Sequence, residues 1–281
     1  MDEFIMDSYG KINLALDILY KRDDGYHEIR SIMQRIGLRD RLMFREIKEG
    51  IIIESNDPHV PLDSSNLVYK AWERLTEFTG LKRGVKISIE KNIPIAAGLA
   101  GGSSNAATTL MGLNKLWDLN LSESELVKIG SGVGADVPFC IIGGTALVEG
   151  IGDRLTKLRT FADKHILLAN PGIEISTPYA YGKVKVLNSG IDIDGMIASI
   201  EEDNLRKVAD KIGNIMEKPM IEEFSIIGKI KDIMLENGAL GSLMSGSGST
   251  VFGLFEDEER MEFTCKKLKE ITDKVFICKT L

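Results

Sequence analysis

The stretch PIAAGLAGGSSNAATTL, residues 94–110, consists mainly of small residues and carries no charge. Before it, residues 85–91 alternate apolar and polar side chains, which predicts a half-buried strand that Pro94 ends. From Ser103 onward, apolar residues recur with helical spacing. In a strand, glycine-rich loop and helix start, backbone N–H groups and the positive helix end converge on an anion. The stretch predicts either a phosphate-binding loop or a helix packed closely against a sheet.

Two common nucleotide-binding patterns do not fit this loop. A Walker loop requires Gly-Lys-Ser or Gly-Lys-Thr, and no lysine lies between Asn92 and Lys115. The dinucleotide-binding fingerprint is missing as well. If the loop binds phosphate, its glycines let the main chain approach the anion, and Ser103 and Ser104 add hydroxyl donors at the first turn of the helix.

The composition is that of a folded protein with one large or two modest domains. The chain has 281 residues, of which 43% are hydrophobic and 27% are charged. The formal net charge is −7 and no block of Lys or Arg occurs, which argues against nucleic acid or an anionic membrane as a partner. The first residues carry acids where a signal peptide carries bases, and no apolar run reaches the roughly 18 residues of a membrane span.

The cysteines and histidines predict no disulfide framework and no zinc site. Cys140, Cys265 and Cys278 are far apart and odd in number, which indicates packing roles in a reducing, cytoplasmic compartment. The histidines have no Cys, His or carboxylate partner at ligand spacing.

Periodicity predicts an irregular alternation of strands and helices, as in an α+β fold. A helix is expected over residues 64–80, with Ser64 or Ser65 as its cap and Gly80 at its end. Ser122 and Glu125 predict a capping box at another helix start. The other expected elements are strands over residues 11–20, 50–55, 165–171 and 274–279, two short strands within residues 139–150, helices between residues 178 and 237 with Pro219 starting one long helix, and a helix over residues 257–271.

Three motifs in this chain resemble those of the GHMP kinases, a family of small-molecule kinases. PIAAGLAGGSSNAAT resembles their central motif, Pro-x-x-x-Gly-Leu-x-x-Ser-Ser with one extra Gly. KINLALDI, residues 11–18, and MSGSGSTVFGLF, residues 244–255, resemble the first and last motifs. The resemblance covers nearly the full chain. It implies a two-domain α+β fold with an N-terminal domain over residues 1–158 and a C-terminal domain over residues 159–281, and with the ATP and substrate site in the cleft between the domains.

One branch of the family is especially similar. KINLALDILYKRDDGYHEIRSIMQRI (11–36), GADVPFCIIGGTALVEGIGDRL (134–155) and GALGSLMSGSGSTVFGLF (238–255) resemble the branch that phosphorylates a CDP-linked sugar alcohol in the non-mevalonate isoprenoid pathway. The triplet Gly25-Tyr26-His27 is the most diagnostic piece, because other GHMP kinases lack it. Ser249 departs from the pattern, which usually has Pro there, and we expect little effect at such a turn.

The resemblance assigns the chemistry to two residues. It makes Asp136 the general base that takes the proton of the acceptor hydroxyl and Lys11 its partner, which stabilises the developing negative charge. The residues alone favour a structural role for both: an Asx-turn or a helix cap for Asp136, and a charge on an edge strand for Lys11.

The resemblance also assigns substrate contacts. Tyr26 would stack on the cytosine, His27 would hydrogen-bond to the base, and Asn13 would contact the same substrate. Tyr181 is the candidate for a second ring facing Tyr26, with Tyr179 as the alternative; each ring could instead pack on a helix. Gly246 and Ser247 would support the central motif and the tail of the acceptor.

ATP and Mg²⁺ are the expected co-substrate and ion, since Mg²⁺ neutralises the β,γ oxygens. The protein ligand of the metal is open, with Ser104 as one possibility, and the chain is expected to be a monomer or a homodimer. Asn66 is expected either to touch the nucleotide or to start a helix. The ATP-binding residues implied by the resemblance are Pro94, Ala97, Gly98, Leu99, Ala100, Gly101, Gly102, Ser103, Ser104 and Asn66.

Two other functions stay open at this point. A GHMP kinase for homoserine or mevalonate is disfavoured by Gly25-Tyr26-His27, because those acceptors have no base to stack. A non-catalytic GHMP-fold regulator is disfavoured by Lys11 and Asp136, which such a protein would be free to lose.

Overall fold

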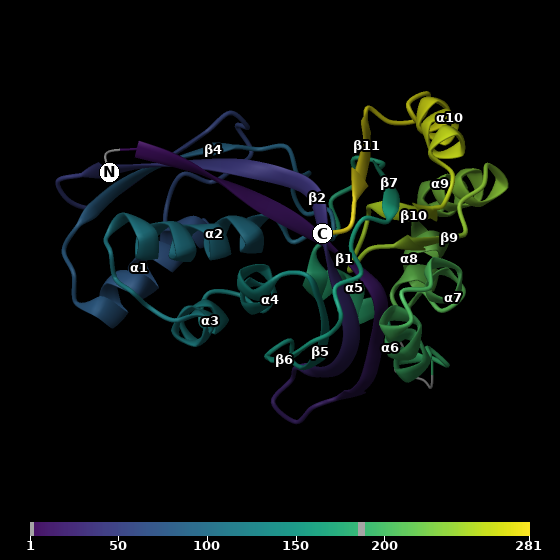
Figure 1. The fold of residues 1–281 in the computed structure, drawn as a ribbon, viewed down its shortest axis with the longest axis horizontal. Coiled ribbons are helices and arrows are strands. Elements are labelled where there is room, and N and C mark those ends of the chain that lie inside the picture. The colour runs from purple at the N-terminus through teal and green to yellow at the C-terminus, as the bar shows by residue number, and fades with distance from the viewer. Residues whose placement is uncertain (1–2, 185–188) are drawn as a thin grey trace. The chain divides into compact units, whose positions relative to one another are not determined.

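The computed structural model describes residues 3–184 and 189–281, and it combines strands and helices throughout (Figure 1). The strands are β1 (Glu3–Lys21), β2 (His27–Ile47), β3 (Ile51–Ser55), β4 (Gly84–Glu90), β5 (Thr145–Gly150), β6 (Arg154–Lys157), β7 (His165–Asn170), β8 (Gly213–Asn214), β9 (Gly241–Met244), β10 (Val251–Phe255) and β11 (Lys274–Lys279). The helices are α1 (Leu67–Thr79), α2 (Gly101–Leu116), α3 (Glu123–Ser131), α4 (Val137–Ile142), α5 (Thr177–Lys183), α6 (Ile193–Glu201), α7 (Leu205–Ala209), α8 (Glu217–Glu223), α9 (Ser225–Glu236) and α10 (Glu258–Leu268).

The chain divides into two compact units. Unit 1 comprises Met1–Gly10, Leu38–Ile95 and Ala100–Gly143, and unit 2 comprises Lys11–Gly37, Ala96–Leu99 and Gly144–Leu281. The units are interleaved along the chain because the long strands β1 and β2 each contribute to both. They therefore do not correspond one to one to the expected domains 1–158 and 159–281, and that boundary stays a prediction.

Unit 1 packs helices against a sheet. The C-terminal part of β2 pairs antiparallel with β4, and β3 pairs parallel with β4. Helices α1, α2, α3 and α4 pack against one another beside these strands (Figure 1). A Cβ at Gly112 of α2 would lie 2.5 Å from the ring of Phe44, a buried residue of β2. The small residues of the central motif therefore do allow a helix to approach the sheet closely.

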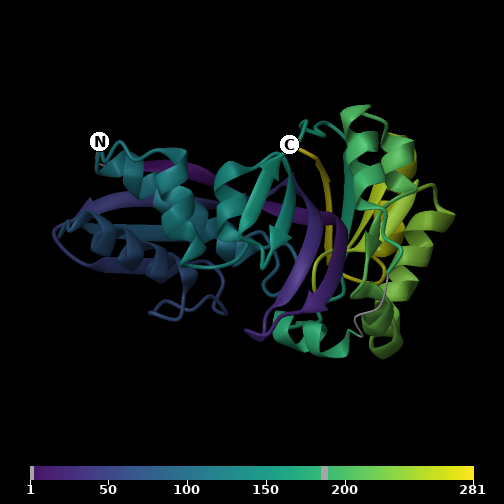
Figure 2. The ribbon, with the colours of Figure 1, turned by 90° about the horizontal axis from the view of Figure 1, so that it is seen from below.

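Unit 2 contains the other parts of β1 and β2, which run side by side (Figure 2). There β2 pairs antiparallel with β5, β5 pairs with β6, and β1 pairs parallel with β8. A second, antiparallel sheet has the order β11-β7-β10-β9.

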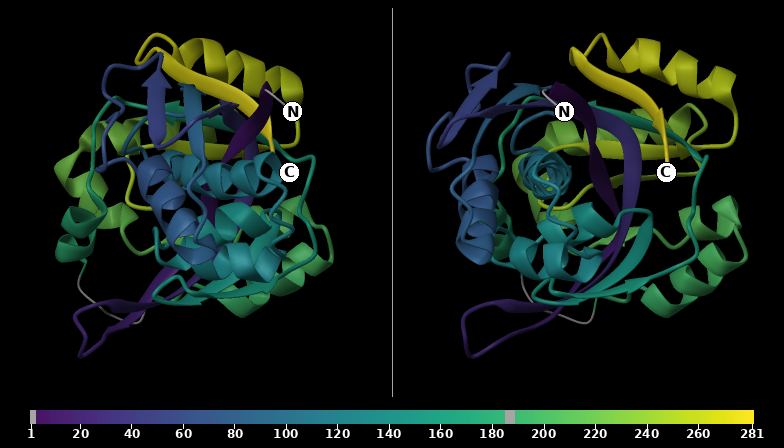
Figure 3. Two further views of the ribbon diagram at one scale, coloured as in Figure 1. Left: turned by 90° about the vertical axis from the view of Figure 1, so that its left-hand side faces the viewer. Right: turned by 60° about the vertical axis from the view of Figure 1, so that its left-hand side comes forward.

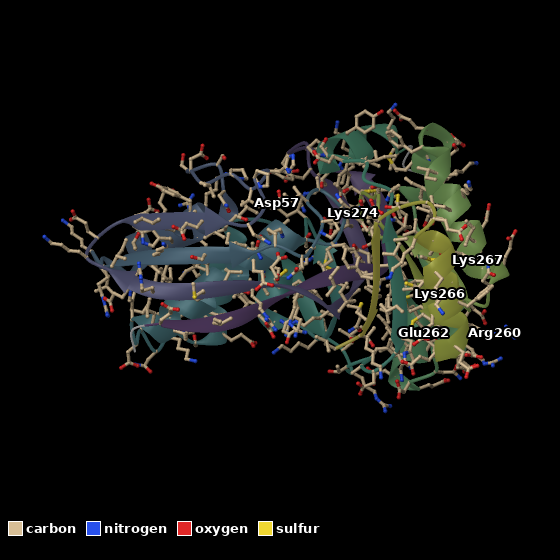
Figure 4. The ribbon with its side chains drawn as sticks, turned by 90° about the horizontal axis from the view of Figure 1, so that it is seen from above. Asp57, Arg260, Glu262, Lys266, Lys267 and Lys274 are labelled. Atoms are coloured by element: carbon tan, nitrogen blue, oxygen red, sulfur yellow. The ribbon has the colours of Figure 1, made fainter. Side chains whose placement is uncertain are left out.

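Helices α9 and α10 pack on this second sheet, and α10 lies along β11 (Figure 3). Helix α10 buries Met261 and Leu268, and the exposed side carries charged residues such as Arg260, Glu262 and Lys266 (Figure 4). Within residues 3–184 and 189–281, no helix has the length and apolar character needed to cross a membrane.

Several elements predicted from the sequence are confirmed, and three predictions are wrong. The capping box of Ser122 and Glu125 is present at α3. Helix α1 exists and ends at Gly80 in the left-handed conformation, but its cap is Asn66 rather than Ser64 or Ser65. Asn66 takes this role because its side-chain oxygen accepts a hydrogen bond from the Val68 N–H at 2.9 Å.

The other two corrections concern apolar segments. The first of the two strands predicted within residues 139–150 is the helix α4, which has Pro138 in its first turn and packs on α2 and α3. A short apolar run does not distinguish a buried helix from a buried strand. The long helix predicted from Pro219 consists of α8 and α9, which meet at Phe224. Of the helical region predicted over 178–237, residues 185–188 lie outside the described residues.

Candidate functional site

The glycine-rich loop leading into α2 has three residues in the left-handed conformation. Ala96, Gly98 and Ala100 have φ values of 49°, 76° and 55°. A Cβ at Gly98 would lie 2.0 Å from the carbonyl oxygen of Ser245, so a side chain is excluded there by space as well as by φ. The alternation turns the backbone sharply just before the start of the helix, which is where an anion would meet the N–H groups of the first turn.

The two glycines that begin α2 have different surroundings. A Cβ at Gly101 would lie 3.0 Å from both the Ile93 side chain and the Lys91 Nζ atom, so this glycine serves packing within unit 1. Gly102 is exposed, and its Cβ would meet only the Leu67 side chain, at 3.7 Å. Of the two, only Gly102 is exposed to solvent.

The two serines of the motif also differ. The Ser104 hydroxyl is buried, donates to the Tyr9 carbonyl oxygen at 2.6 Å and accepts from Ser8 at 2.9 Å. Asn105 extends the same network by donating to Ser8 and to the buried carboxylate of Asp40. Ser104 therefore ties α2 to β1, whereas Ser103 is only half-buried.

Two further predicted site residues lie in unit 1. Asn66 is mostly buried, and its amide also donates to the Pro61 carbonyl oxygen at 2.6 Å. These contacts are those of a residue that starts a helix, one of its two expected roles. Asp136 precedes α4 and not a strand. It is the N-cap residue of α4, as the helix-cap interpretation expects, but its half-buried side chain makes no capping hydrogen bond.

In unit 2, β1 carries Lys11 and Asn13 into the interior. The Lys11 side chain is buried and donates to Asn13 Oδ1 at 2.7 Å, and Asn13 donates to the Ser31 hydroxyl at 2.8 Å. Ser31 completes the chain of hydrogen bonds by donating to the Ala15 carbonyl oxygen at 2.6 Å. A lysine is rarely buried unless its charge is paired or hydrogen-bonded. Because Lys11 is buried, it is not an exposed charge on an edge strand.

The loop between β1 and β2 presents the triplet Gly25-Tyr26-His27. Gly25 has a φ of 86°, and the Arg22 N–H donates to the Tyr26 carbonyl oxygen at 2.8 Å, which closes the turn. The Tyr26 side chain is 60% exposed, so a face of its ring is open for stacking. Behind the triplet, the buried Glu28 carboxylate accepts from Arg22 at 2.9 Å and from Arg154 at 2.6 Å.

The second aromatic ring of this region stacks on His27. The rings of His27 and Tyr181 have a centroid distance of 4.8 Å and an interplanar angle of 25°. Tyr181 is itself packed against the apolar core of unit 2. Burial, and then the charge of Lys21, hold the pKa of His27 below its usual value of 6.5, which favours the neutral form of the imidazole.

Tyr179, the alternative to Tyr181, makes different contacts. Its hydroxyl donates to Glu223, and Lys183 lies over its ring at 4.9 Å from the centroid while pairing with the same carboxylate. Tyr179 therefore joins α5 to α8, and Tyr181 is the ring that lies against the predicted base-reading triplet.

The last motif forms a turn that holds the glycine-rich loop within unit 2. The Ser245 hydroxyl donates to the Gly98 carbonyl oxygen at 3.0 Å, and a Cβ at Gly246 would lie 3.4 Å from Asn13 Oδ1. Ser247, like Gly246, is buried. Unit 2 thus brings Asn13, Gly98 and Gly246 together from three distant parts of the sequence.

Sequence reasoning missed the residues that hold this turn. Asn214 donates to the carbonyl oxygens of Met244 and Gly246, both at 2.8 Å, and Glu217 accepts from the Met244 N–H at 2.9 Å. The signal that the sequence offers is two polar residues three positions apart, Asn214 and Glu217, within a region predicted to be helical. In the described part of the chain, no group of three or more His, Cys, Asp or Glu side chains is arranged to hold a metal ion.

Known proteins match this chain over nearly its full length. The chain matches the GHMP kinases N terminal domain over residues 66–144 and the GHMP kinases C terminal domain over residues 196–272. The 4-diphosphocytidyl-2-C-methyl-D-erythritol kinase of Caldicellulosiruptor saccharolyticus is 44% identical over 98% of this chain and 96% of its own length. The chain belongs to the GHMP kinase family. The kinase of the same name from Acetivibrio thermocellus is 43% identical over 100% of both chains.

Solved GHMP kinase structures share the fold. The crystal structure of a 4-(cytidine 5'-diphospho)-2C-methyl-D-erythritol kinase matches with a TM-score of 0.84 and 28% identity over 99% of both chains. Homoserine kinase from Cytophaga hutchinsonii matches with a TM-score of 0.79 at 20% identity, over 100% of this chain and 95% of its own, which shows the fold alone. The predicted two-domain α+β GHMP kinase fold is confirmed, and the chain is a small-molecule kinase with ATP as its co-substrate.

Proposed function

We propose that this GHMP kinase transfers the γ-phosphoryl group of ATP to the 2-hydroxyl of 4-diphosphocytidyl-2-C-methyl-D-erythritol, a step of the non-mevalonate isoprenoid pathway. The observation that carries the proposal is the identity of 43–44% over nearly the full length with kinases named for this acceptor. The exposed ring of Tyr26 beside His27 supports it, because a cytidine-linked acceptor offers a base to stack.

ATP is proposed to bind with its phosphates at the start of α2. The exposed Gly102 and the half-buried Ser103 offer backbone N–H groups and a hydroxyl at the positive end of a helix. The remaining loop residues, from Pro94 to Gly101, are proposed to bring their backbone towards the phosphates, and Gly98 and Gly101 have no room for a side chain.

Mg²⁺ is proposed to accompany the nucleotide. The ion would be held mainly by phosphate oxygens and water, with one or two protein groups at most, a common arrangement for this cation. When bound, it would neutralise charge on the β,γ oxygens.

The chemistry is proposed to rest on Asp136 and Lys11. Asp136 takes the proton from the acceptor hydroxyl as the oxygen attacks the γ-phosphorus, and Lys11 stabilises the negative charge that develops on that oxygen. The hydrogen bond from Lys11 to Asn13 fixes the ammonium group in the interior of unit 2, so it needs little reorganisation during the reaction.

We propose that the protein recognises the acceptor through the cytosine base. Tyr26 stacks on the cytosine, and His27 hydrogen-bonds to the base as a neutral imidazole that Tyr181 holds in place. Asn13, Gly246 and Ser247 contact the rest of the acceptor. The three free cysteines support a cytoplasmic protein, and the net charge of −7 supports small molecules rather than nucleic acid as its partners. A monomer or a homodimer is proposed as its oligomeric state.

The direct test is incubation with ATP, Mg²⁺ and three acceptors: 4-diphosphocytidyl-2-C-methyl-D-erythritol, homoserine and mevalonate. Mass measurement should find a phosphorylated product, heavier by one phosphoryl group, with the first acceptor only. Phosphorylation of homoserine or mevalonate in its place would overturn the assignment of the acceptor.

The proposed base is tested by Asp136→Asn. This variant should lose about 10²–10⁴-fold in kcat while it still binds both substrates, because an amide cannot accept the proton. Steady-state kinetics and ligand binding measure the two effects. Asp118→Asn, at an exposed position of unit 1, is the matched control and should retain wild-type rates. An Asp136→Asn variant that keeps more than about a third of the wild-type kcat would refute the role.

A further inference from the structure

The side chain of Asn214 is fully engaged with the turn of the last motif. Its amide nitrogen donates to the carbonyl oxygens of Met244 and Gly246, and its Oδ1 accepts from the Met216 N–H at 2.9 Å. The residue is buried, on the short strand β8 that pairs with β1 at Ala15 and Leu16. Because the buried amide of Asn214 makes all of these hydrogen bonds, it fixes the position of the main-chain atoms that it contacts.

Glu217, three residues later, holds the same segment from another side. Its Oε1 accepts from the Met244 N–H at 2.9 Å, and its Oε2 accepts from Lys231, so the largely buried carboxylate has a counter-ion. Asn214 and Glu217 together bind both the N–H and the carbonyl oxygen of Met244, the last residue of β9.

The segment held in this way is closely surrounded. Gly246 has a φ of 56°, and a Cβ there would lie 3.1 Å from the Gly98 carbonyl oxygen and 3.4 Å from Asn13 Oδ1. A side chain at this position would therefore be crowded by Asn13 and the glycine-rich loop, so the turn packs against both.

We propose that Asn214 and Glu217 are positioning residues for acceptor binding, which act by fixing the turn from Met244 to Ser247 against Asn13. The inference rests on the proposed function, in which Asn13, Gly246 and Ser247 contact the acceptor. Neither residue needs to touch the substrate, because each acts through main-chain atoms of the turn.

The first test is Asn214→Asp, which keeps the size of the side chain but places a carboxylate oxygen against two carbonyl oxygens. The KM for 4-diphosphocytidyl-2-C-methyl-D-erythritol should rise by about tenfold, since sub-ångström shifts of a binding group have effects of this order. The KM for ATP should change less than about threefold, because Ala97 and Leu99 keep their own hydrogen bonds from Thr250 and Lys11.

The second pair of variants separates the hydrogen bond from the charge. Glu217→Gln keeps an oxygen that can accept from Met244 and should retain the wild-type KM for the acceptor, whereas Glu217→Ala should raise it. Asn204→Ala is the control for lost stability, since Asn204 caps α7 by accepting from the Lys207 N–H. It should lower Tm and leave the acceptor KM unchanged.

Hydrogen exchange gives a readout that requires no turnover. The amides of Met244 and Gly248, which donate to Glu217 and to the Ser245 carbonyl oxygen, should exchange faster in Asn214→Asp than in the wild type or in Asn204→Ala. If the wild type does not phosphorylate the acceptor, the proposed function fails, while this measurement still decides whether Asn214 fixes the turn.

Three results would overturn the inference, and a fourth applies if Asn214→Asp does not fold. The first is an acceptor KM for Asn214→Asp within about twofold of the wild type, measured at a temperature well below the Tm of the variant. The second is an equal rise in Asn204→Ala, which would make the effect one of general stability. The third is unchanged exchange at Met244 and Gly248. If Asn214→Asp does not fold, equal acceptor KM values for Glu217→Gln and Glu217→Ala would overturn it.

Discussion

Gly102 lies at the second position of α2 and has room for a methyl group, since the nearest atom to its Cβ position is 3.7 Å away. Gly102→Ala should leave the stability unchanged or raise it slightly, because alanine favours helices by up to about 1 kcal/mol over glycine. It should nevertheless raise the KM for ATP, because the new methyl group would stand between the backbone and the phosphates. Thermal unfolding and steady-state kinetics on the same protein measure both effects.

Gly101→Ala is the matched control for this prediction. Its methyl group would press on Ile93 and Lys91 at 3.0 Å inside unit 1, so the expected loss is in Tm. An ATP KM that stays at the wild-type value in Gly102→Ala would mean that the start of α2 is a packing element and not the phosphate site.

In the proposed function, Tyr26 is the residue that separates this kinase from relatives whose acceptors have no base. Its ring is 60% exposed, and the turn around it is held by main-chain and carboxylate contacts that do not involve the ring. Tyr26→Ala should therefore raise the acceptor KM by about 5–150-fold, the equivalent of about 1–3 kcal/mol of base stacking, while the ATP KM stays nearly constant. Tyr26→Phe should be mild, because the face of the ring makes the contact.

Tyr20→Ala controls for the loss of an exposed ring from the same pair of strands, since Tyr20 is 53% exposed near the end of β1. It should leave both KM values unchanged. Parallel losses for ATP and acceptor in Tyr26→Ala, or no loss at all, would show that the ring has a structural role only.

At the scale of elements, one buried carboxylate joins β2, the loop before the central motif and α2. Asp40 is fully buried, pairs with Lys91, and accepts from the backbone N–H groups of Asn92 and Ile93 at 2.7 and 2.8 Å. Asp40→Asn should destabilise the fold by about 3–5 kcal/mol, because Lys91 would then be a buried charge without its partner. Urea unfolding measures the change.

The matched comparison is the more exposed pair of Lys86 and Glu54 in the same unit. Lys86→Met should change the unfolding midpoint very little, since solvent screens such pairs. Adding Lys91→Met to Asp40→Asn should recover part of the loss, because it removes the unpaired charge. A single Asp40→Asn variant as stable as the wild type would contradict the importance of this junction.

The sequence predicted elements well where local chemistry determines them. The capping box at Ser122 and the Gly80 stop of α1 depend on nearest neighbours, and both are present. Helix α4 was mistaken for a strand because its six residues are apolar all round, and only its contacts with α2 and α3 explain the helix. Neighbouring residues thus predict where helices begin and end, but they do not predict the secondary structure of short buried segments.

The site shows the same division. The motifs identified the glycine-rich loop and the Tyr26–His27 triplet, because both have distinctive residues in a fixed order. They did not reveal Asn214 or Glu217, because these residues act on main-chain atoms more than twenty-five positions away in the sequence. Nor did they distinguish Ser103 from the buried Ser104, whose hydroxyl is directed to Tyr9 by the packing of α2 on β1. Long-range contacts set these roles.

At the scale of the whole molecule, segments far apart in the sequence meet within unit 2. The Lys11 N–H donates to the Leu99 carbonyl oxygen at 3.1 Å, and the Ser245 hydroxyl donates to Gly98 at 3.0 Å. The first, central and last motifs of the family are therefore parts of one structure. A ligand that contacts any of them should stabilise the native state as a whole, because all three must be folded for it to bind.

This linkage allows a test without the full acceptor. Cytidine monophosphate at about 100 times its Kd should stabilise the native state by about 2.7 kcal/mol, which for a chain of this size raises Tm by about 5 °C. ATP should raise Tm by its own contacts. In Tyr26→Ala the shift with cytidine monophosphate should shrink while the shift with ATP persists, because the variant removes the base platform alone. Thermal scans of both proteins with each ligand measure the four shifts. Equal shifts with cytidine monophosphate in the two proteins would place the cytidine away from Tyr26 and remove the structural basis for the proposed acceptor.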